Sequence, residues 1–494
     1  MASSMGSAGL ALTLMAVVAA CAEPDASREQ EPSRPDASRL DTGTDPGVVA
    51  PGARDDASSV DAPSSSSADT GAPAPGTPRP DSGGSNIPTE DAGAPATPAE
   101  AGVDLSVELY DPAAFPRFDL ELPDASIAAL NQVQNAEDER QNSYVRGTLR
   151  YGAETIENIG VRLKGEGSFQ KLDRKPAFKL KFDEFVNDQA FRGLRRLTLN
   201  NAFEDPSFLA ERLAYEVFRA AELPAPRCNN ASLYINGTFY GVYVNVEAED
   251  KTFLRRWFED EDGNLYEEGQ KDFVPGAETA FNLETNETRN DRSHLQQLIA
   301  AIQGATTPDR FLDDVGAHLD TTQFLRFTAA EASVNQWDMY GYTVFYVNNM
   351  RIYDDPTRGK FVFLPWGMDM SMKPFRDSRK PFIGLFTLAR QGDRANAPIS
   401  AGLILQRCLA SSTCKAAYAK AVEEIIGVYE GLKLESRAMT YFAQIREQVM
   451  LDQRKNVCCQ GGKLSNAQFE AGFQSVLSTI RGRVAALRAD LATR

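Results

Sequence analysis

Residues 205–250 read DPSFLAERLAYEVFRAAELPAPRCNNASLYINGTFYGVYVNVEAED, a helix signal followed by a hairpin signal. Apolar residues recur at helical spacing through the first half, and Asp205 predicts the N-cap of that helix. In the second half, Asn236-Gly237 separates two alternating apolar runs, which is the strongest short signal of a β-hairpin. A long helix beside a hairpin predicts an α+β fold.

Strand signals precede this stretch and helical signals follow it. Period-two alternation predicts strands in LSVELYDP, FDLELP, SYVRGTLRYG, ENIGVRLKGEG, AFKLKFDEF and RRLTLNN, starting at residues 105, 118, 143, 157, 177 and 195. From about residue 290 helical patterns dominate, interrupted by one predicted β-ribbon over residues 343–366. We therefore predict a sheet-rich half over residues 104–250 and a helical half over residues 251–494.

The N-terminal segment, residues 1–21, is typical of an export signal. Its apolar run of small and aliphatic side chains is shorter than a typical membrane span. Small residues directly before Cys21 look like the lipobox at which bacterial lipoproteins are cleaved and lipidated. The segment contains no Lys or Arg, so plain secretion and an uncleaved anchor stay open as alternatives.

Residues 22–103 have the composition of a disordered linker. Of the 27 prolines in the chain, 13 fall in residues 22–100, which contain no Phe, Tyr or Trp. Fifteen acidic residues against five arginines make this stretch strongly negative, and it lacks the apolar surface to offset the ordering entropy. We predict a solvated spacer between anchor and domain. A nucleic-acid partner is disfavoured because the chain has no basic stripe.

The cysteines suggest an oxidising compartment more than a metal site. Cys408 and Cys414 lie six residues apart, a spacing that can close a small loop between two helices. The adjacent Cys458 and Cys459 cannot easily bond to each other, and the pairing of these residues stays open. A zinc centre is not expected, because no paired C-x-x-C occurs and both histidines are distant from every cysteine in sequence.

Two aspartates beside tryptophans are the first candidates for chemistry. Asp338 follows Trp337 at the end of a predicted helix, and Asp369 lies three residues after Trp366 at the end of the predicted ribbon. If these ends meet in a cleft, the carboxylates suit a metal-phosphate site or an acid–base pair. The structural alternative is that the aspartates cap turns and the tryptophans fill the core.

A second candidate is a glycine-containing turn in KGEGSFQKLDRKPAFKLKF, residues 164–182. Backbone amides freed by Gly165 and Gly167 can cradle phosphates. Positive charge is available from the lysines of this stretch, Lys164, Lys175, Lys179 and Lys181. The pattern matches neither common phosphate-loop motif, and an ordinary hairpin turn is the alternative.

The order of these features matches the plan of a protein-kinase fold. A glycine turn is followed by a lysine-bearing strand, a helix where αC would stand, a hairpin leading to the adenine hinge, and a helical half with two Asp motifs. We therefore predict a kinase-like, two-lobed arrangement with a sheet-rich N-lobe and a helical C-lobe. In that plan Asp338 takes the catalytic-loop position.

The motifs themselves also resemble a known family. The runs R-x-K-G-x-G-S, K-P-A-F-K-L-K-F, L-Y-I-N-G-x-x-x-G-V-Y-x-x-x-E, N-x-W-D and L-P-W-x-M-D are similar to those of CotH kinases, over roughly residues 105–480. The resemblance implies an atypical kinase that binds ATP with Mg²⁺ or Mn²⁺ and phosphorylates secreted or coat proteins. It covers most of the predicted folded region.

The resemblance also implies roles for single residues. Asp338 matches the catalytic aspartate, Lys175 the lysine that meets ATP phosphates, Glu247 the hinge-side glutamate, and Asp369 the metal ligand. The glycine turn with Lys164 would hold phosphates as well. A glutamate of the αC type is matched by Glu211, although Arg212 fits the family pattern at this helix equally well, so both assignments stay open.

Two positions depart from the family pattern. Thr343 stands where family members often have a metal-binding Asn, and Gly367 stands at the first aspartate of P-W-D-x-D. Since Mg²⁺ is usually held by carboxylates and substrate phosphates, these changes weaken the expected site. The main hypothesis is an exported, lipid-anchored kinase acting on envelope or coat proteins. The alternatives are a catalytically degenerate kinase-like assembly module and a glycan hydrolase built on Asp338 and Asp369.

Overall fold

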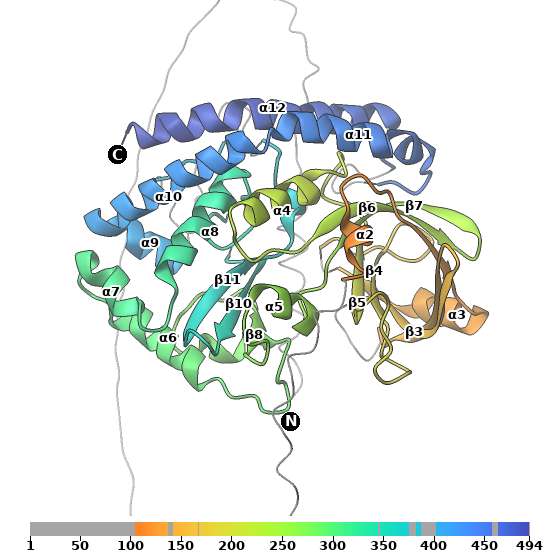
Figure 1. The fold of residues 1–494 in the computed structure, drawn as a ribbon, viewed down its shortest axis with the longest axis horizontal. Helices are drawn as coiled ribbons and strands as arrows, with labels where there is room; N and C mark the ends of the chain where they lie inside the picture. Colours follow the sequence, from red (N-terminus) through yellow and green to blue (C-terminus); the bar gives the residue numbers. More distant parts are fainter. Residues whose placement is uncertain are drawn as a thin grey trace, which may run out of the picture. The chain divides into compact units, whose positions relative to one another are not determined.

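The computed structural model describes residues 104–136, 142–165, 167–343, 346–374, 382–386, 402–456 and 463–493. The predicted signal segment with Cys21, the predicted linker and the Cys458-Cys459 pair lie outside these residues. From Asp104 onward the chain belongs to one compact unit, in which a sheet-rich part precedes a helix-rich part (Figure 1). This arrangement confirms the predicted α+β class.

The sheet-rich part is a closed barrel with strand order β1-β2-β3-β4-β5-β7-β6. Its strands are β1 (Arg117–Glu121), β2 (Val145–Tyr151), β3 (Glu154–Lys164), β4 (Ala177–Lys181), β5 (Arg196–Asn200), β6 (Cys228–Ile235) and β7 (Thr238–Val246). Neighbours are antiparallel except β1 and β6, which run in parallel and close the barrel. Alternating apolar side chains, including Leu120, Val161 and Leu197, fill the interior.

The predicted hairpin is present between β6 and β7. Asn236 and Gly237 both have positive φ, 48° and 76°, which a tight two-residue hairpin turn requires. The Asn236 side chain accepts a hydrogen bond from the Leu122 amide (2.7 Å) and donates to the Leu122 carbonyl (2.9 Å). The same residue thus shapes the turn and attaches it to the end of β1.

The prediction of a strand at residues 105–112 is wrong. LSVELYDP forms the short helix α2 (Val107–Tyr110), whose Leu109 and Tyr110 side chains are buried against the barrel. The segment is so short that its apolar pattern fits both a strand and one helical turn. Its contacts with β6 favour the helical turn. Helix α3 (Asp124–Gln132) follows β1 and packs against β2.

Helix α4 (Ala210–Ala220) starts later than predicted, and Asp205 is not its N-cap. Asp205 lies in the preceding turn, where one carboxylate oxygen accepts from the Ser207 amide (2.8 Å) and the other from the Ala210 amide (2.7 Å). The aspartate therefore still satisfies a free N–H of the first helical turn. Helix α4 packs against the short 3-10 turn Met368–Met370, which carries Asp369.

A second sheet lies in the other part of the chain, with strand order β11-β10-β8-β9. Its strands are β8 (Leu265–Glu267), β9 (Asn282–Leu283), β10 (Met350–Asp355) and β11 (Lys360–Pro365), and β10 with β11 forms the predicted ribbon. The helices before the ribbon are α5 (Lys251–Trp257), α6 (Ser293–Gly304), α7 (Phe311–Val315) and α8 (Thr321–Ser333). Helix α8 packs on β11 and leads directly to Trp337 and Asp338.

The chain ends in helices, as predicted: α9 (Leu403–Ala410), α10 (Ser412–Gly431), α11 (Leu434–Leu451) and α12 (Asn466–Leu491). Figure 1 shows α11 and α12 side by side along one edge of the domain, consistent with the contacts between them. A disulfide joins Cys408 in α9 to Cys414 in α10, which confirms the predicted loop. Among the described helices, none combines the length and apolar character needed to cross a bilayer.

Candidate active site

A polar cleft of about 700 Å³ lies where the barrel meets the second sheet. Lys164, Gly165 and Gly167 from the end of β3 line it, together with Asp338 and Asp369 from the helical half. The structure therefore brings together five of the site residues predicted from the sequence. Residues of β4, β5, α4 and β8 complete the walls, including Lys179, Asn200, Glu211 and Glu267.

Asp338 lies in the loop after α8, partly exposed to the cleft. Its carboxylate oxygen Oδ2 accepts hydrogen bonds from the side-chain amides of Asn348 (3.2 Å) and Asn349 (2.9 Å). Burial, followed by the negative charge of Asp369, raises the pKa of Asp338 to about 7. A carboxylate with a pKa near neutrality suits proton acceptance from a hydroxyl group.

Two side chains that the sequence did not single out hold the Asp338 loop in place. Glu331 of α8 is fully buried and accepts from the backbone amides of Gly341 (3.0 Å) and Tyr342 (2.8 Å). Gln336 accepts from the Asp338 amide (3.2 Å) and donates to the Gly367 carbonyl (3.0 Å). The loops that carry Asp338 and Asp369 are thus fixed to each other through one glutamine.

Lys164 is connected to the helix glutamate through an amide rather than directly. Its Nζ donates to Asn200 Oδ1 (3.0 Å), and the Asn200 amide nitrogen donates to both carboxylate oxygens of Glu211 (3.0 and 2.9 Å). Burial and the nearby charge of Asp369 raise the pKa of Glu211 to about 8, while burial lowers that of Lys164. Glu211 and Arg212 of α4 were both considered for the role of the αC glutamate, and Glu211 is the one that lines the cleft.

Arg212 points away from the cleft. Its guanidinium donates to the Pro112 carbonyl (2.8 Å) and to Gln444 (2.9 Å), and it stacks 3.5 Å from the centre of the Tyr441 ring. Its contacts join the start of the folded chain to α11, so the role of Arg212 is structural.

The glycine turn after β3 needs glycine for steric reasons. Gly165 has a φ of 112°, and a Cβ there would lie 2.7 Å from Ser168 Oγ. The carbonyl groups of Ser168 and Lys175 both accept from the Asn201 side chain, at 3.0 and 2.9 Å, which holds together the two ends of the segment 168–175. The segment that follows the two glycines is therefore anchored by Asn201, which also lines the cleft.

A second cation, Lys179 of β4, also lines the cleft and belongs to an ionic cluster. Burial lowers its pKa to about 8, and the carboxylates of Glu267 and Glu284 oppose that shift. Glu267 also pairs with the buried Arg351 (3.1 Å), which in turn lies 3.3 Å from Glu249. These charges join β4 of the barrel to β8 and β10 of the second sheet.

Lys175 does not line the cleft. Its ammonium is completely buried and pairs with Asp452 Oδ2 at 2.5 Å, at the end of α11. The Phe208 ring lies 4.5 Å from the same nitrogen. The structure does not support a phosphate contact by Lys175, because its charge is already neutralised in the protein interior.

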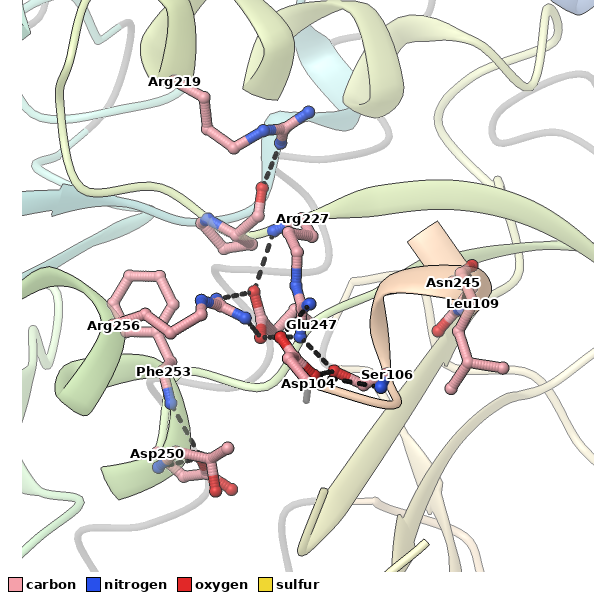
Figure 2. A network of polar contacts seen from close by, with 12 residues as sticks. Asp104, Ser106, Leu109, Arg219, Arg227, Asn245, Glu247, Asp250, Phe253 and Arg256 are labelled. Carbon is pink, nitrogen blue, oxygen red and sulfur yellow. Dashed lines mark hydrogen bonds and ion pairs between the residues drawn. The ribbon is translucent and has the colours of Figure 1, made fainter. Parts of the chain in front are cut away.

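Glu247 is also a structural residue in this geometry. Figure 2 shows its carboxylate between the guanidinium groups of Arg227 and Arg256, beside Asp104 and Ser106. The Arg227 Nη2–Glu247 Oε1 distance is 2.8 Å, and the Glu247 side chain is only 2% exposed. Arg227 also pairs with Asp104 (2.9 Å). Glu247 therefore ties the chain between β7 and α5 to the start of the folded domain and does not reach the cleft.

The two positions that depart from the family pattern have different surroundings. Thr343 donates its hydroxyl hydrogen to the Tyr346 carbonyl and does not line the cleft. Gly367 lines the cleft with φ 57° and ψ 54°, and the side chain of Asn349 occupies the space above it.

Comparison with known proteins agrees with this geometry. The sequence profile described as CotH kinase protein matches residues 161–486, well over half of the 494-residue chain. The chain belongs to the CotH kinase family. Membership supports the kinase-like interpretation of the barrel, the cleft and the helical part. The matched range includes every cleft residue discussed above.

One sequence relative and one solved structure are similar to this CotH-family protein. The inner spore coat protein H of Bacillus subtilis strain 168 is 24% identical over 310 residues, covering 60% of this chain and 80% of the relative. Among solved structures, the Helicobacter pylori proinflammatory kinase CtkA matches with a TM-score of 0.30 and 8% identity, over 64% of this chain and 94% of that one.

The cleft residues of the CotH domain fit a divalent cation that is shared with a nucleotide. Within the described ranges, no three His, Cys, Asp or Glu side chains gather as a metal centre. Asp338 and Asp369 nevertheless present hard carboxylate oxygens to the same cleft. Mg²⁺ is commonly held by one or two carboxylates, with waters and substrate phosphates completing its ligands. The donor set therefore suits Mg²⁺ or Mn²⁺ bound together with ATP.

Proposed function

We propose that this CotH-family protein is an exported, lipid-anchored kinase that transfers the γ-phosphoryl group of ATP to hydroxyl groups of envelope or coat proteins. The observation that carries the proposal is the single cleft lined by Lys164, the glycine turn, Asp338 and Asp369. The cleft combines a cation, two glycines whose backbone can approach phosphate closely, a candidate base and a candidate metal ligand, which are the parts that phosphoryl transfer needs.

Each residue has a defined task in this mechanism. Lys164 and the backbone amides of Gly165 and Gly167 bind phosphate oxygens. Asp338 orients the acceptor hydroxyl and takes its proton as the oxygen bonds to phosphorus and ADP leaves. Asp369 would hold a bound Mg²⁺ or Mn²⁺, which would neutralise phosphate charge.

Two observations support an extracytoplasmic setting. The Cys408–Cys414 disulfide is typical of an oxidising compartment. The curated relative is named as an inner spore coat protein, so a coat or envelope location is a reasonable extension to this chain. The lipid anchor at Cys21 rests on the sequence pattern alone.

Calorimetric titration of ATP into the full chain tests the proposal, with Mg²⁺, Mn²⁺ or EDTA present. We expect metal-dependent binding that Asp369→Ala abolishes. Asp338→Ala should retain binding but lose phosphoryl transfer to a protein acceptor. Absence of ATP binding under every condition would sink the kinase assignment.

Gly367 favours a second candidate, a catalytically degenerate module that acts by contact in envelope or coat assembly. A glycine contributes no carboxylate at a position where family members often have aspartate. In this case ATP binding would be independent of metal or absent, and Asp338→Ala would leave the biological activity of the protein unchanged.

A further inference from the structure

The space above Gly367 is filled by another side chain from the cleft. A Cβ atom at residue 367 would lie 2.2 Å from Asn349 Oδ1 and 2.6 Å from its Cγ, far inside van der Waals contact. Any larger residue here must displace Asn349. The glycine and the asparagine are therefore a coupled pair, in which the absence of one side chain admits the other.

The orientation of the Asn349 carboxamide follows from its hydrogen bonds. Its nitrogen donates to the backbone carbonyl of Asp338 (2.7 Å) and to the Asp338 carboxylate (2.9 Å). Both partners are acceptors, so the nitrogen must face them and the oxygen must face Gly367. Among the hydrogen bonds of the described residues, none ends on this oxygen.

The oxygen is also chemically suited to the cleft. Asn349, Gly367 and Asp369 all line it, and side-chain amide oxygens are ordinary ligands of hard divalent cations. Asn349 lies just before β10, whose first residue Met350 pairs with Pro365 in β11, so its backbone is anchored beside the loop that carries Asp369. A neutral ligand here adds an oxygen without adding a third negative charge next to Asp338 and Asp369.

We propose that Asn349 is the cation ligand that replaces the missing carboxylate at residue 367, so that Asp369 and Asn349 Oδ1 hold a divalent cation together. The same carboxamide holds Asp338 through its nitrogen, which links the position of the base to the position of the cation. This inference rests on the cation-binding part of the proposed function.

Mn²⁺ binding to the full chain without nucleotide tests the ligand assignment, by electron paramagnetic resonance and calorimetry. Asn349→Ala should weaken Mn²⁺ affinity at least about tenfold, the scale typical of losing a group that supports a metal site. Asn348→Ala is the matched control, because Asn348 donates to the same Asp338 oxygen. If the weaker Mn²⁺ binding of Asn349→Ala does not come from its lost hydrogen bond to Asp338, Asn348→Ala should change Mn²⁺ affinity by less than about twofold.

The coupling with Gly367 gives a second, independent measurement. Gly367→Asp alone should bind Mn²⁺ poorly, because its Cβ collides with Asn349. Gly367→Asp combined with Asn349→Ala should restore affinity to the wild-type value or above. Thermal unfolding without metal identifies any variant that is simply misfolded.

The proposal is overturned if Asn349→Ala keeps wild-type Mn²⁺ affinity while Asp369→Ala abolishes it, or if the wild-type chain binds no Mn²⁺. A wild-type chain that binds Mn²⁺ in the expected variant pattern but transfers no phosphate would instead overturn the kinase function and leave the ligand assignment intact.

Discussion

The cleft and the junction between α11 and the barrel each hold a lysine from the segment 164–182, in different ways. Lys175 is sealed in the interior and pairs directly with Asp452. Lys164 is partly exposed to the cleft and reaches Glu211 only through the neutral side chain of Asn200. A directly paired buried charge serves the fold, whereas a charge held through an amide remains available to an incoming anion.

The largest effect is expected at the sealed lysine. Lys175→Met should destabilise the protein by about 3–5 kcal/mol, because the Asp452 carboxylate stays buried without its cation. The double variant Lys175→Met/Asp452→Asn removes that charge and should recover about half of the loss. Urea unfolding of the full chain measures both values. A single variant within about 1 kcal/mol of wild type would remove the distinction between the two lysines.

The second largest effect is expected for the cleft lysine, Lys164, and it concerns phosphoryl transfer rather than stability. Lys164→Ala should lower phosphoryl transfer about 10²–10³-fold, the usual cost of removing a fixed charge-stabilising group, with unfolding free energy changed by under about 1 kcal/mol. The control is Lys181→Ala in β4, which removes a surface lysine paired with Glu184 (2.8 Å) and should retain transfer. Equal losses in both variants would contradict a specific role for Lys164.

The smallest effect concerns the protonation of Glu211. Its pKa is about 8 in the folded protein against an ordinary value of 4.5. Between these two pH values the native state therefore keeps a proton on Glu211 that the unfolded chain has lost. Stability should therefore fall as pH rises from about 5 to 9. In Glu211→Gln this fall should be shallower, as shown by urea unfolding at several pH values. Glu435→Gln, an exposed carboxylate paired with Arg481, should keep the wild-type slope.

Local patterns predicted most of the fold and the outline of the site. Period-two alternation located the barrel strands, and Asn236-Gly237 located the hairpin, because both signals act within a few residues. The order of motifs predicted that Asp338, Asp369 and the glycine turn would share a cleft. The short segment at residue 107 was misassigned because one helical turn carries too little periodicity.

Residue roles that depend on distant partners were beyond the sequence. Lys175 matched the pattern of a phosphate lysine, but its role is set by Asp452, 277 residues later. Glu247 was likewise assigned to the hinge, while two arginines determine its position. Asn349 gave no signal at all, since its place depends on the space that Gly367 leaves.

The pair formed by Lys175 and Asp452 has a consequence for biosynthesis. All strands of the barrel have been made by residue 246, yet the counter-ion of Lys175 lies at residue 452. The Val242 amide in β7 also donates to the Asp452 carboxylate (3.3 Å), so this strand contacts the same residue. The native contacts at this junction can therefore form only after the end of α11 has been synthesised.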